Sequence, residues 1–551
     1  MSLIMDRELV TPGYSVGLDA AGTITGATAQ AQTFTNGIIT AGLSDLTGGL
    51  MAPWTRTRIV DAGGKGNYTT LSAALAAIVD AAAGNTYTIY VVSSVAETDT
   101  VAGKSYVDIV GANNATITMS KTTSGAAVSL EDLVYTTWRN LRIVRAGEIA
   151  NGQSSVYALW IGGTSDSSVR CEHVVAENLC TRVATADHLA GLVIGGDATP
   201  TLIACEGIGS SIAYYGHGIW WQQQAAGLAL NCIGRGGPAA GGQANNWGIY
   251  ILNTAAPTLM GCVGYGSHAG ANGYGIYIRG TAAPSLLNCH GSGGDVGTLS
   301  HGIILADAAK PLISGGVYQG GTGGTSYGLL VSNYAAPEIH GASFVPKSFV
   351  HTETVTATGT FVISAVVAHQ IKAVSLNVGV AGTAASLAIG TTVGGAEIIT
   401  ATDISSAGTK YPVLVDAGAE PQLAANATLY VTITGTGSPS VGIYLSGEYA
   451  PASSYAVYLN GAGAVRLDRC TLIGNCYASY GLVIGTDART ADKLRVMNCH
   501  IEERADKAGA GVAIYTGSAY NPAPIYNCTL IGAATNITAA AGTANGTNTL
   551  I

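Results

Sequence analysis

Six stretches in the middle of this chain are variants of one ten-residue pattern, in which a turn, a short apolar run and a small residue follow in the same order. The pattern returns every 26 to 30 residues. A regular period of this length is typical of a solenoid, in which each repeat packs on its neighbours and does not fold alone. The copies are Ala198–Gly207, Ala225–Gly234, Ala255–Gly264, Ala282–Gly291, Ala309–Tyr318 and Ala335–Phe344. The chain is therefore expected to form a stack of coils.

A second apolar run precedes every copy after the first. These runs are HGIWW, WGIYI, YGIYI, HGIIL and YGLLV, which begin at His217, Trp247, Tyr274, His301 and Tyr327. Two or three short strands per period, separated by Gly, Asn and Ala-Pro turns and without a helical pattern between them, predict strands that stack from coil to coil. The fold class that fits is all-β, a right-handed parallel β-helix.

Cysteines mark one position of the repeat, and small residues replace them in two copies. In chain order the position is held by Cys205, Cys232, Cys262, Cys289, Gly316 and Ala342, and again near the C-terminus by Cys470, Cys499 and Cys528. Stacked strands bring equivalent side chains to about 4.8 Å from one another. A column of small apolar side chains is therefore expected in the core, and the β-helix is expected to resume near the C-terminus.

The ten cysteines allow a second interpretation, a set of disulfides. Neighbours in such a column point the same way from successive coils, which is poor geometry for a bridge, and each thiol is better buried as a small hydrophobic group. Free, buried thiols are therefore expected; only Cys171 with Cys180, and Cys470 with Cys476, are close enough in sequence to pair locally. The chain has no CxxC and no zinc-type Cys/His spacing, so no metal and no cofactor are expected.

The charge balance limits the partners. The formal net charge is −9 and the basic residues form no run, whereas nucleic-acid binding needs a basic surface. The opening MSLIMDRELV lacks the regions of a signal peptide, and no stretch of about 18 apolar residues is present to insert into a membrane. Apolar residues make up 48% of the chain and charged residues only 10%, which favours a packed, β-rich protein over a disordered one.

Residues 59–119 carry a different signal. A Gly-rich turn leads into YTTLSAALAAIV, and a strand is expected over 88–92. The apolar residues Leu71, Leu75, Ile78 and Val79 share one side of a predicted helix, which Thr69, Thr70 or Ser72 caps. This order resembles the start of pectin-lyase-like β-helix proteins, in which such a helix covers the open end of the first coil. The resemblance covers about 59–346 and 452–535, and it implies the same fold and capping role here.

The coil repeat breaks between 349 and 450. Longer runs there alternate apolar and polar residues, which predicts an antiparallel β-sandwich inserted between coils. Its TVTATGTFVIS, GTTVGGAEII and ATLYVTITG segments resemble small sandwich modules of tailed-phage head and tail proteins. The expected domains are an N-terminal arm or attachment segment (1–55), a capped β-helix (56–348), the inserted sandwich (349–450), and C-terminal coils with a tail (451–551).

Side chains that alternate with the inward residues of the second run are expected to form an outward column. Trp220, Tyr250 and Tyr277 belong to it, with Gln222 and Arg279 two residues further on. Aromatic rings beside amide and guanidinium groups can bind sugars, because rings stack on apolar sugar faces while polar groups take the hydroxyls. The same rings suit packing against another subunit or the sandwich. The column is therefore a candidate contact with either a glycan or a subunit.

Two further sets of residues are expected to be structural. Gln223, Asn253, Asp307 and Asn333 follow the second run, where stacked polar side chains satisfy the backbone of a coil corner. His217 and His301 occupy a place that aromatic rings hold in sister coils, which favours packing over catalysis.

No catalytic motif occurs, and whether the chain is an enzyme stays open. If it is one, the fold suits a glycoside hydrolase or a polysaccharide lyase, which needs paired carboxylates or a base with acidic ligands for calcium. Asp468 and Glu502 lie near equivalent cysteines of successive C-terminal coils and form the candidate catalytic pair. A salt-paired, solvated surface is the competing interpretation.

Together these features predict a tailed-phage virion protein of the spike or fibre type, made in the host cytoplasm without a signal peptide and exposed on the particle. There it is expected to engage host surface glycan or neighbouring virion proteins. The resemblance to phage spikes implies a homotrimer. Two alternatives are kept: a tailspike polysaccharide depolymerase, and a capsid decoration or head-fibre protein without a ligand.

Overall fold

The computed structural model describes residues 56–550 with gaps, chiefly at 150–154, 183–187, 211–214, 238–244 and 268–271 and at several segments beyond 366. Contacts divide the chain into two units, 1–57 and 58–551. Before residue 56 only the antiparallel pair β1 (Gly17–Leu18) and β2 (Ile24–Thr25) is described. The arm expected over 1–55 therefore lies largely outside the described residues.

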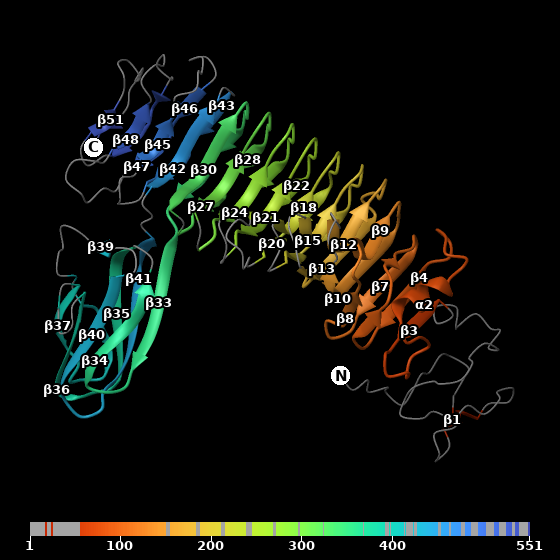
Figure 1. Ribbon diagram of the computed structural model, residues 1–551, viewed down its shortest axis with the longest axis horizontal. Coiled ribbons are helices and arrows are strands. Elements are labelled where there is room, and N and C mark those ends of the chain that lie inside the picture. Colours follow the sequence, from red (N-terminus) through yellow and green to blue (C-terminus); the bar gives the residue numbers. More distant parts are fainter. Residues whose placement is uncertain are drawn as a thin grey trace. The chain divides into compact units, whose positions relative to one another are not determined.

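Parallel strands stack coil upon coil in a β-helix of about 13 turns, which confirms the expected fold (Figure 1). One face is a 13-stranded parallel sheet. Its strands are β6 (Val101–Ala102), β9 (Gly125–Glu131), β12 (Ser155–Gly162), β15 (His188–Ile194), β18 (Tyr215–Trp221), β21 (Asn245–Ile251), β24 (Asn272–Ile278), β27 (Leu299–Leu305), β30 (Thr325–Asn333), β42 (Ser453–Gly461), β45 (Tyr480–Ile484), β48 (Val512–Thr516) and β51 (Thr535–Thr538). Equivalent strands of successive coils are hydrogen-bonded neighbours.

Two ladders of shorter strands complete each coil. One contains β16 (Thr201–Ile203), β19 (Leu228–Leu230), β22 (Thr258–Met260), β25 (Ser285–Leu287), β28 (Leu312–Ser314), β31 (Glu338–His340), β43 (Val465–Asp468), β46 (Leu494–Met497) and β49 (Ile525–Tyr526). The other contains β17 (Glu206–Ile208), β20 (Ile233–Arg235), β23 (Val263–Tyr265), β26 (His290–Ser292), β29 (Val317–Gln319), β32 (Ser343–Val345), β44 (Thr471–Ile473), β47 (His500–Glu502) and β50 (Thr529–Ile531). In the first coils the strands are β3 (Thr57–Val60), β4 (Tyr87–Val91), β5 (Val95–Glu97), β7 (Val107–Gly111), β8 (Thr116–Ser120), β10 (Thr136–Ala146) and β13 (Val169–Asn178).

Each strand of the second run places the Ile or Leu that follows its glycine in the core between the ladders. Ile219, Ile249 and Ile276 stand in register and are at most 1% exposed. The glycine before each of them is required by space: a Cβ on Gly248 would lie 2.4 Å from the backbone nitrogen of Tyr265. The repeated Gly-Ile pair therefore reflects the close approach of two strands across the coil.

The small-residue column runs from Cys205 to Cys528. The N–H after each member donates to the carbonyl oxygen of the equivalent residue one coil back, as from Ile233 to Cys205 and from Val263 to Cys232, both at 2.8 Å. The described cysteines are all buried and free, whereas Cys476 lies outside the described residues. Contacts with the thiols of Cys205 and Cys262, together with burial, raise the pKa of Cys232. We infer a column of neutral thiols that pack as small hydrophobic groups.

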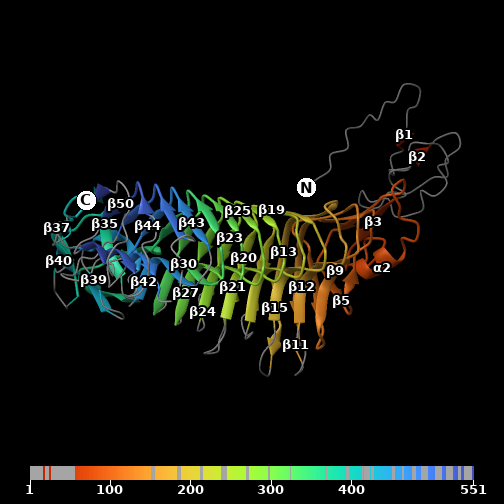
Figure 2. The same cartoon turned by 90° about the horizontal axis from the view of Figure 1, so that it is seen from above.

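A short helix, α2 (Leu71–Ala76), packs on the end of the core, next to β5 (Figure 2). Thr70 is its N-cap, and Glu97 accepts the N–H of Leu71 at 2.6 Å. Lys104 donates to the carbonyl oxygen of Leu75 at 3.3 Å, so each end of the helix has a charge of the favourable sign. The expectation for Val79 was wrong: the helix ends before it, and Val79 is 89% exposed.

Coil corners adopt the left-handed conformation. After the second run, positive φ occurs at Gln223 (60°), Asn253 (65°), Asp307 (58°) and Asn333 (56°). Just before the small-residue column it occurs at Asn231 (52°), Gly261 (61°), Asn288 (51°), Asn498 (54°) and Asn527 (52°). Asn and Gly enter this conformation more readily than most residues. The polar residues after the second run thus lie at coil corners, and Gln223 Oε1 accepts the backbone N–H of Gly196 as expected.

An antiparallel sandwich interrupts the coils. Its strands are β33 (Ser348–Val355), β34 (Gly359–Val366), β35 (His369–Val380), β36 (Thr383–Gly390), β37 (Ile399–Asp403), β38 (Gly408–Lys410), β39 (Gln422–Leu423), β40 (Ala427–Thr436) and β41 (Ser440–Tyr449). They form two sheets, β33-β41-β35-β38 and β34-β40-β36-β37, around a separate core. Since Ser348 pairs with Glu448, the chain leaves and re-enters the coils at adjacent points. The coils on either side pair directly, β30 with β42, β31 with β43 and β32 with β44.

Candidate functional site

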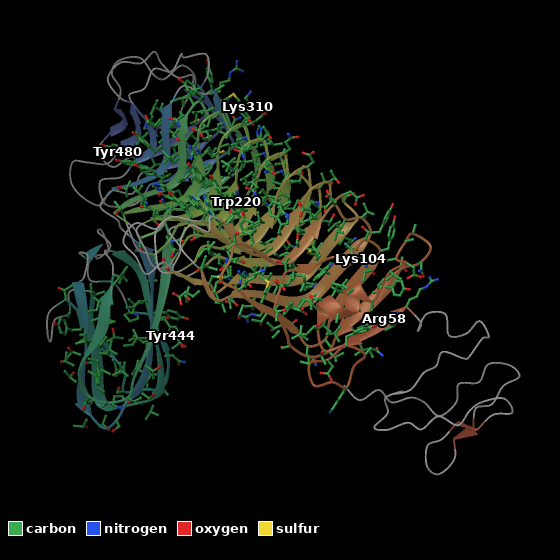
Figure 3. The ribbon with its side chains drawn as sticks, turned by 45° about the vertical axis from the view of Figure 1, so that its right-hand side comes forward. Arg58, Lys104, Trp220, Lys310, Tyr444 and Tyr480 are labelled. Atoms are coloured by element: carbon green, nitrogen blue, oxygen red, sulfur yellow. The ribbon has the colours of Figure 1, made fainter. Side chains whose placement is uncertain are left out.

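The candidate contact residues lie on the outer side of the 13-stranded sheet. Trp220, Tyr250 and Tyr277, called here the first ring column, are in register on β18, β21 and β24. They belong to a hydrophobic cluster separate from the core of the coils. Figure 3 labels Trp220 on the stacked strands. Alternation along the strands therefore places them as expected from the sequence.

The rings of the first column stack on one another. The ring centroids of Trp220 and Tyr250 are 5.9 Å apart with an interplanar angle of 22°, and those of Tyr250 and Tyr277 are 5.4 Å apart at 14°. Trp220 and Tyr250 are each only 5% exposed, whereas Tyr277 is half-buried. The ring faces are thus largely occupied by neighbouring rings.

A second ring column runs beside the first. It contains His217, Trp247, Tyr274, His301, Tyr327 and Tyr455. His217 stacks on Trp247 at 4.7 Å and 9°, and His301 on Tyr327 at 4.5 Å and 6°. Burial lowers the pKa of His217 and lowers that of His301 to about 3, so both imidazoles are neutral at pH 7. The expected packing role of these two histidines is confirmed.

Stacking within the columns bears on what the first column can bind. A sugar that stacks on an aromatic ring needs an open ring face, and Trp220 and Tyr250 offer little. Three buried nitrogens of the two columns, Trp220 Nε1, Trp247 Nε1 and His217 Nδ1, have no hydrogen-bond partner among the described residues. Leaving such a group unpaired costs about 1–3 kcal/mol. This geometry favours packing of the rings on one another over sugar stacking.

The polar candidates stand at the coil corner beside the first column. Arg279 Nε donates to Asp307 Oδ2 at 2.8 Å, and Asn333 Nδ2 donates to Asp307 Oδ1 at 3.1 Å. The bond between Arg279 and Asp307 raises the pKa of the first and lowers that of the second. Gln222 is half-buried. Arg279 is therefore a paired cation at a corner, with half of its side chain exposed.

Asp468 and Glu502 fall in different ladders. Asp468 ends β43, where its equivalent one coil on is Met497, whereas Glu502 ends β47 and pairs with Ile473. Asp468 accepts from Asn498 Nδ2 at 3.0 Å, and this bond lowers the pKa of its carboxyl group. Glu502 contacts His500 Nε2 at 3.1 Å. No hydrogen bond or ion pair among the described residues joins the two carboxylates, and Asp468 is held ionised, which does not suit a proton donor.

A charged network that the sequence did not reveal crosses the joint between the coils on either side of the insert. His340 Nε2 lies 3.0 Å from Glu338 Oε1, and His340 Nδ1 lies 3.4 Å from Asp468 Oδ2. Arg466 Nη1 lies 3.2 Å from Glu338 Oε1. The whole sandwich separates Glu338 from Arg466, and His340 from Asp468, in sequence. The coil register nevertheless places the members of each pair opposite one another. That register was the signal available in the sequence.

Across the described ranges, no group of three or more His, Cys, Asp or Glu side chains is placed to hold a metal ion. No helix in the described part of the chain is long and apolar enough to cross a membrane.

The fold defines the class: this is a right-handed parallel β-helix protein with an inserted antiparallel sandwich. No protein-family model matches the chain, and no curated protein does. Among solved structures, it is similar to the A-module of the mannuronan C-5 epimerase AlgE6 from Azotobacter vinelandii, at 10% identity and TM-score 0.36 over 87% of this chain and 94% of that one.

Two phage tailspikes show weaker similarity. The tailspike gp49 of Acinetobacter baumannii bacteriophage Fri1, a capsular polysaccharide depolymerase, has 11% identity and TM-score 0.24 over 72% of this chain and 85% of that one. The tailspike of Acinetobacter phage vB_ApiP_P1 has 9% identity and TM-score 0.22 over 66% and 82%. At these values the similarities carry no argument about activity or partners, which must come from the chain's own residues.

Proposed function

We propose that the chain is a spike- or fibre-like structural protein of a tailed-phage virion, exposed on the particle, where it engages host surface glycan or neighbouring virion proteins. The observation that carries the proposal is the direct pairing of the coils on either side of the insert. A coil stack whose strands pair directly on either side of the insert can carry a folded module without depending on that module for its own stability. A display scaffold needs this property. The resemblance of the sandwich segments to phage modules supports the virion assignment.

A homotrimer is the proposed assembly. The outer position of the ring columns supports it, because a row of aromatic side chains on the outer side of a sheet suits packing against a second protein surface. Light scattering on the purified chain measures the assembly. A mass three times that of the chain is expected, and a monomer at micromolar concentration would refute the trimer.

Particle composition tests the virion proposal. Phage particles from the lysate that encodes the chain are purified on a density gradient, and the protein is located by mass spectrometry and immunogold labelling. We expect a fixed number of copies per particle with label at the tail. Label on tail-less heads would instead select the decoration or head-fibre alternative, and absence from purified particles would refute the proposal.

A depolymerase is the second candidate function. It is favoured by the joint network, which brings the carboxylates of Glu338 and Asp468 from separate coils onto one imidazole. Incubation with host-cell polysaccharide, followed by assays for new reducing or unsaturated ends, tests it. Cleavage that Asp468→Asn or Glu338→Gln abolishes, while Glu502→Gln leaves it intact, would place the chemistry at the joint.

A further inference from the structure

One surface of the sandwich has the open aromatic ring that the ring columns of the coils lack. Tyr444 lies on β41 between the inward residues Ile443 and Leu445, which are at most 1% exposed. Tyr444 itself is 42% exposed and faces outward from the sheet β33-β41-β35-β38. Figure 3 shows the sandwich strand that carries it.

The ring of Tyr444 leans along its own strand over Gly442. A Cβ on Gly442 would lie 3.4 Å from Cε2 and 3.6 Å from the hydroxyl oxygen of Tyr444. The missing side chain therefore leaves room for the ring to lie against the sheet while the residue stays exposed. A tyrosine held in this way, rather than projecting freely, is a platform for the apolar face of a sugar.

A second exposed tyrosine directly follows the edge strand of the same sheet. Strand β38 pairs with β35 so that Lys410 is opposite Leu376 and Thr409 opposite Asn377. Strand β38 ends at Lys410, and Tyr411, the next residue, is 79% exposed. On β35, Ser375 pairs with Tyr444. Strand β41, which carries Tyr444, and strand β38, which Tyr411 follows, lie on either side of β35. A ligand must extend across β35 to contact both tyrosines.

The side chains around Tyr444 are polar and small. The register places Thr354, Ser375, Asn377 and Gly442 beside Tyr444, and Thr409 lies opposite Asn377. The centre of a protein interface is depleted of such polar surface and enriched in apolar side chains. Hydroxyl and amide groups beside an aromatic ring instead match sugar hydroxyls.

Charge selects among glycans. Residues 349–450 contain two lysines, no arginine and six acidic residues. An anionic polysaccharide is normally bound by Arg and Lys, and this module has almost none. We propose that the outer face of the sheet β33-β41-β35-β38 binds a neutral polysaccharide chain, with Tyr444 and Tyr411 as its two stacking platforms. The inference rests on the proposed engagement of glycan and is independent of where the protein sits on a virion.

Affinity electrophoresis of the full chain tests this inference. Native gels contain dextran, soluble starch or yeast mannan, with alginate as the anionic comparison. We expect at least one neutral polysaccharide to retard the protein, and alginate to retard it little. Tyr444→Ala should weaken the retardation at least tenfold, and Tyr444→Phe, which keeps the ring, less than threefold. Tyr334→Ala, which removes a tyrosine that is 71% exposed outside the sandwich, is the matched control and should change nothing.

Several results would overturn the inference. They are the absence of retardation by every neutral polysaccharide, stronger retardation by alginate, and retardation that Tyr444→Ala leaves unchanged. A change in sedimentation on Tyr444→Ala without loss of glycan binding would assign the face to a second copy of the chain. If Tyr444→Ala does not fold, Tyr411→Ala carries the test. Particle composition tests the virion proposal separately. Failure of the glycan inference can therefore be distinguished from failure of the virion proposal.

Discussion

The backbone N–H of Thr471 donates to the carbonyl oxygen of Ala342 at 2.9 Å, although the whole sandwich lies between these residues in the sequence. The small-residue column is therefore continuous from Cys289 through Gly316 and Ala342 to Cys470. The coils on either side of the insert therefore pair directly with each other, and the insert does not interrupt their hydrogen bonding.

Removal of the sandwich should leave the coils folded. Replacing residues 349–447 by two glycines keeps the joint, because Ser348 and Glu448 are already paired neighbours. We expect a soluble protein with the β-sheet circular dichroism and thermal transition of the coils in the full chain. Aggregation on expression would show that the insert is needed to form the joint. The same variant should lose retardation by neutral polysaccharide.

The small-residue column should reject charge. Cys262 is fully buried between Cys232 and Cys289. Cys262→Ala should lower the free energy of unfolding by about 1 kcal/mol, since it removes one heavy atom. Cys262→Arg buries an unpaired charge and should prevent folding. Urea denaturation and soluble yield measure the two variants, and equal stability of both would contradict the inward position of the column.

Stability, rather than sugar binding, should depend on the first ring column. Trp220→Ala removes a stacked, buried ring and should cost about 3–5 kcal/mol of unfolding free energy. Trp220→Phe should cost clearly less. Neutral-polysaccharide retardation should be the same in both as in the native chain. Loss of retardation with unchanged stability would return the glycan site to this column.

Acid should destabilise the second ring column. His301 is neutral in the folded coil because burial lowers its pKa to about 3, whereas an unfolded histidine titrates near 6.5. Between these values the unfolded chain binds the additional proton, so His301 contributes its full stability above about pH 6.5 and loses it as pH falls toward 3. The slope is about 1.4 kcal/mol per pH unit. His301→Tyr, the residue that a sister coil uses, should remove this part of the slope in urea titrations between pH 4 and 6.

The joint network should contribute more than the C-terminal acid pair. Asp468→Ala leaves Asn498 without its acceptor and removes the carboxylate that lies 3.4 Å from His340 Nδ1, and it should cost about 1.5–3 kcal/mol. Glu502→Ala removes a contact with His500, whose side chain is 38% exposed, and should cost less than about 1 kcal/mol. The stabilities of the two variants are compared by their denaturant midpoints, provided that the denaturant dependence of the unfolding free energy is the same in both. A larger loss for Glu502→Ala would place the structural weight outside the joint.

The repeat predicted the coils because one physical constraint acts at each position. Inward Ile, the Gly at a close approach and the small residue at the column recur, since every coil meets the same neighbours. Asn231, Asn288 and Asn498, each just before a cysteine, carried a further signal for left-handed corners that the sequence interpretation did not use.

What the repeat could not give was the use of the outward residues. Alternation shows that Trp220 points away from the core, but only the structure shows that neighbouring rings cover the face of its indole ring. Asp468 and Glu502 sit near equivalent cysteines, yet the corner between β43 and β44 sends them to different ladders. Val79 fits the apolar side of a helix that in fact ends before it, because local propensity does not fix where tertiary packing stops a helix.

Since every coil bonds only to the coils beside it, the stack works as a ruler graduated in steps of about 4.8 Å. Deleting or duplicating one full period shortens or lengthens the stack by one coil. The coils on either side of the change then still meet strands that they can pair with. The distance between helix α2 and the point where the sandwich departs is thus a number of coils. Selection can adjust that number without redesigning either end.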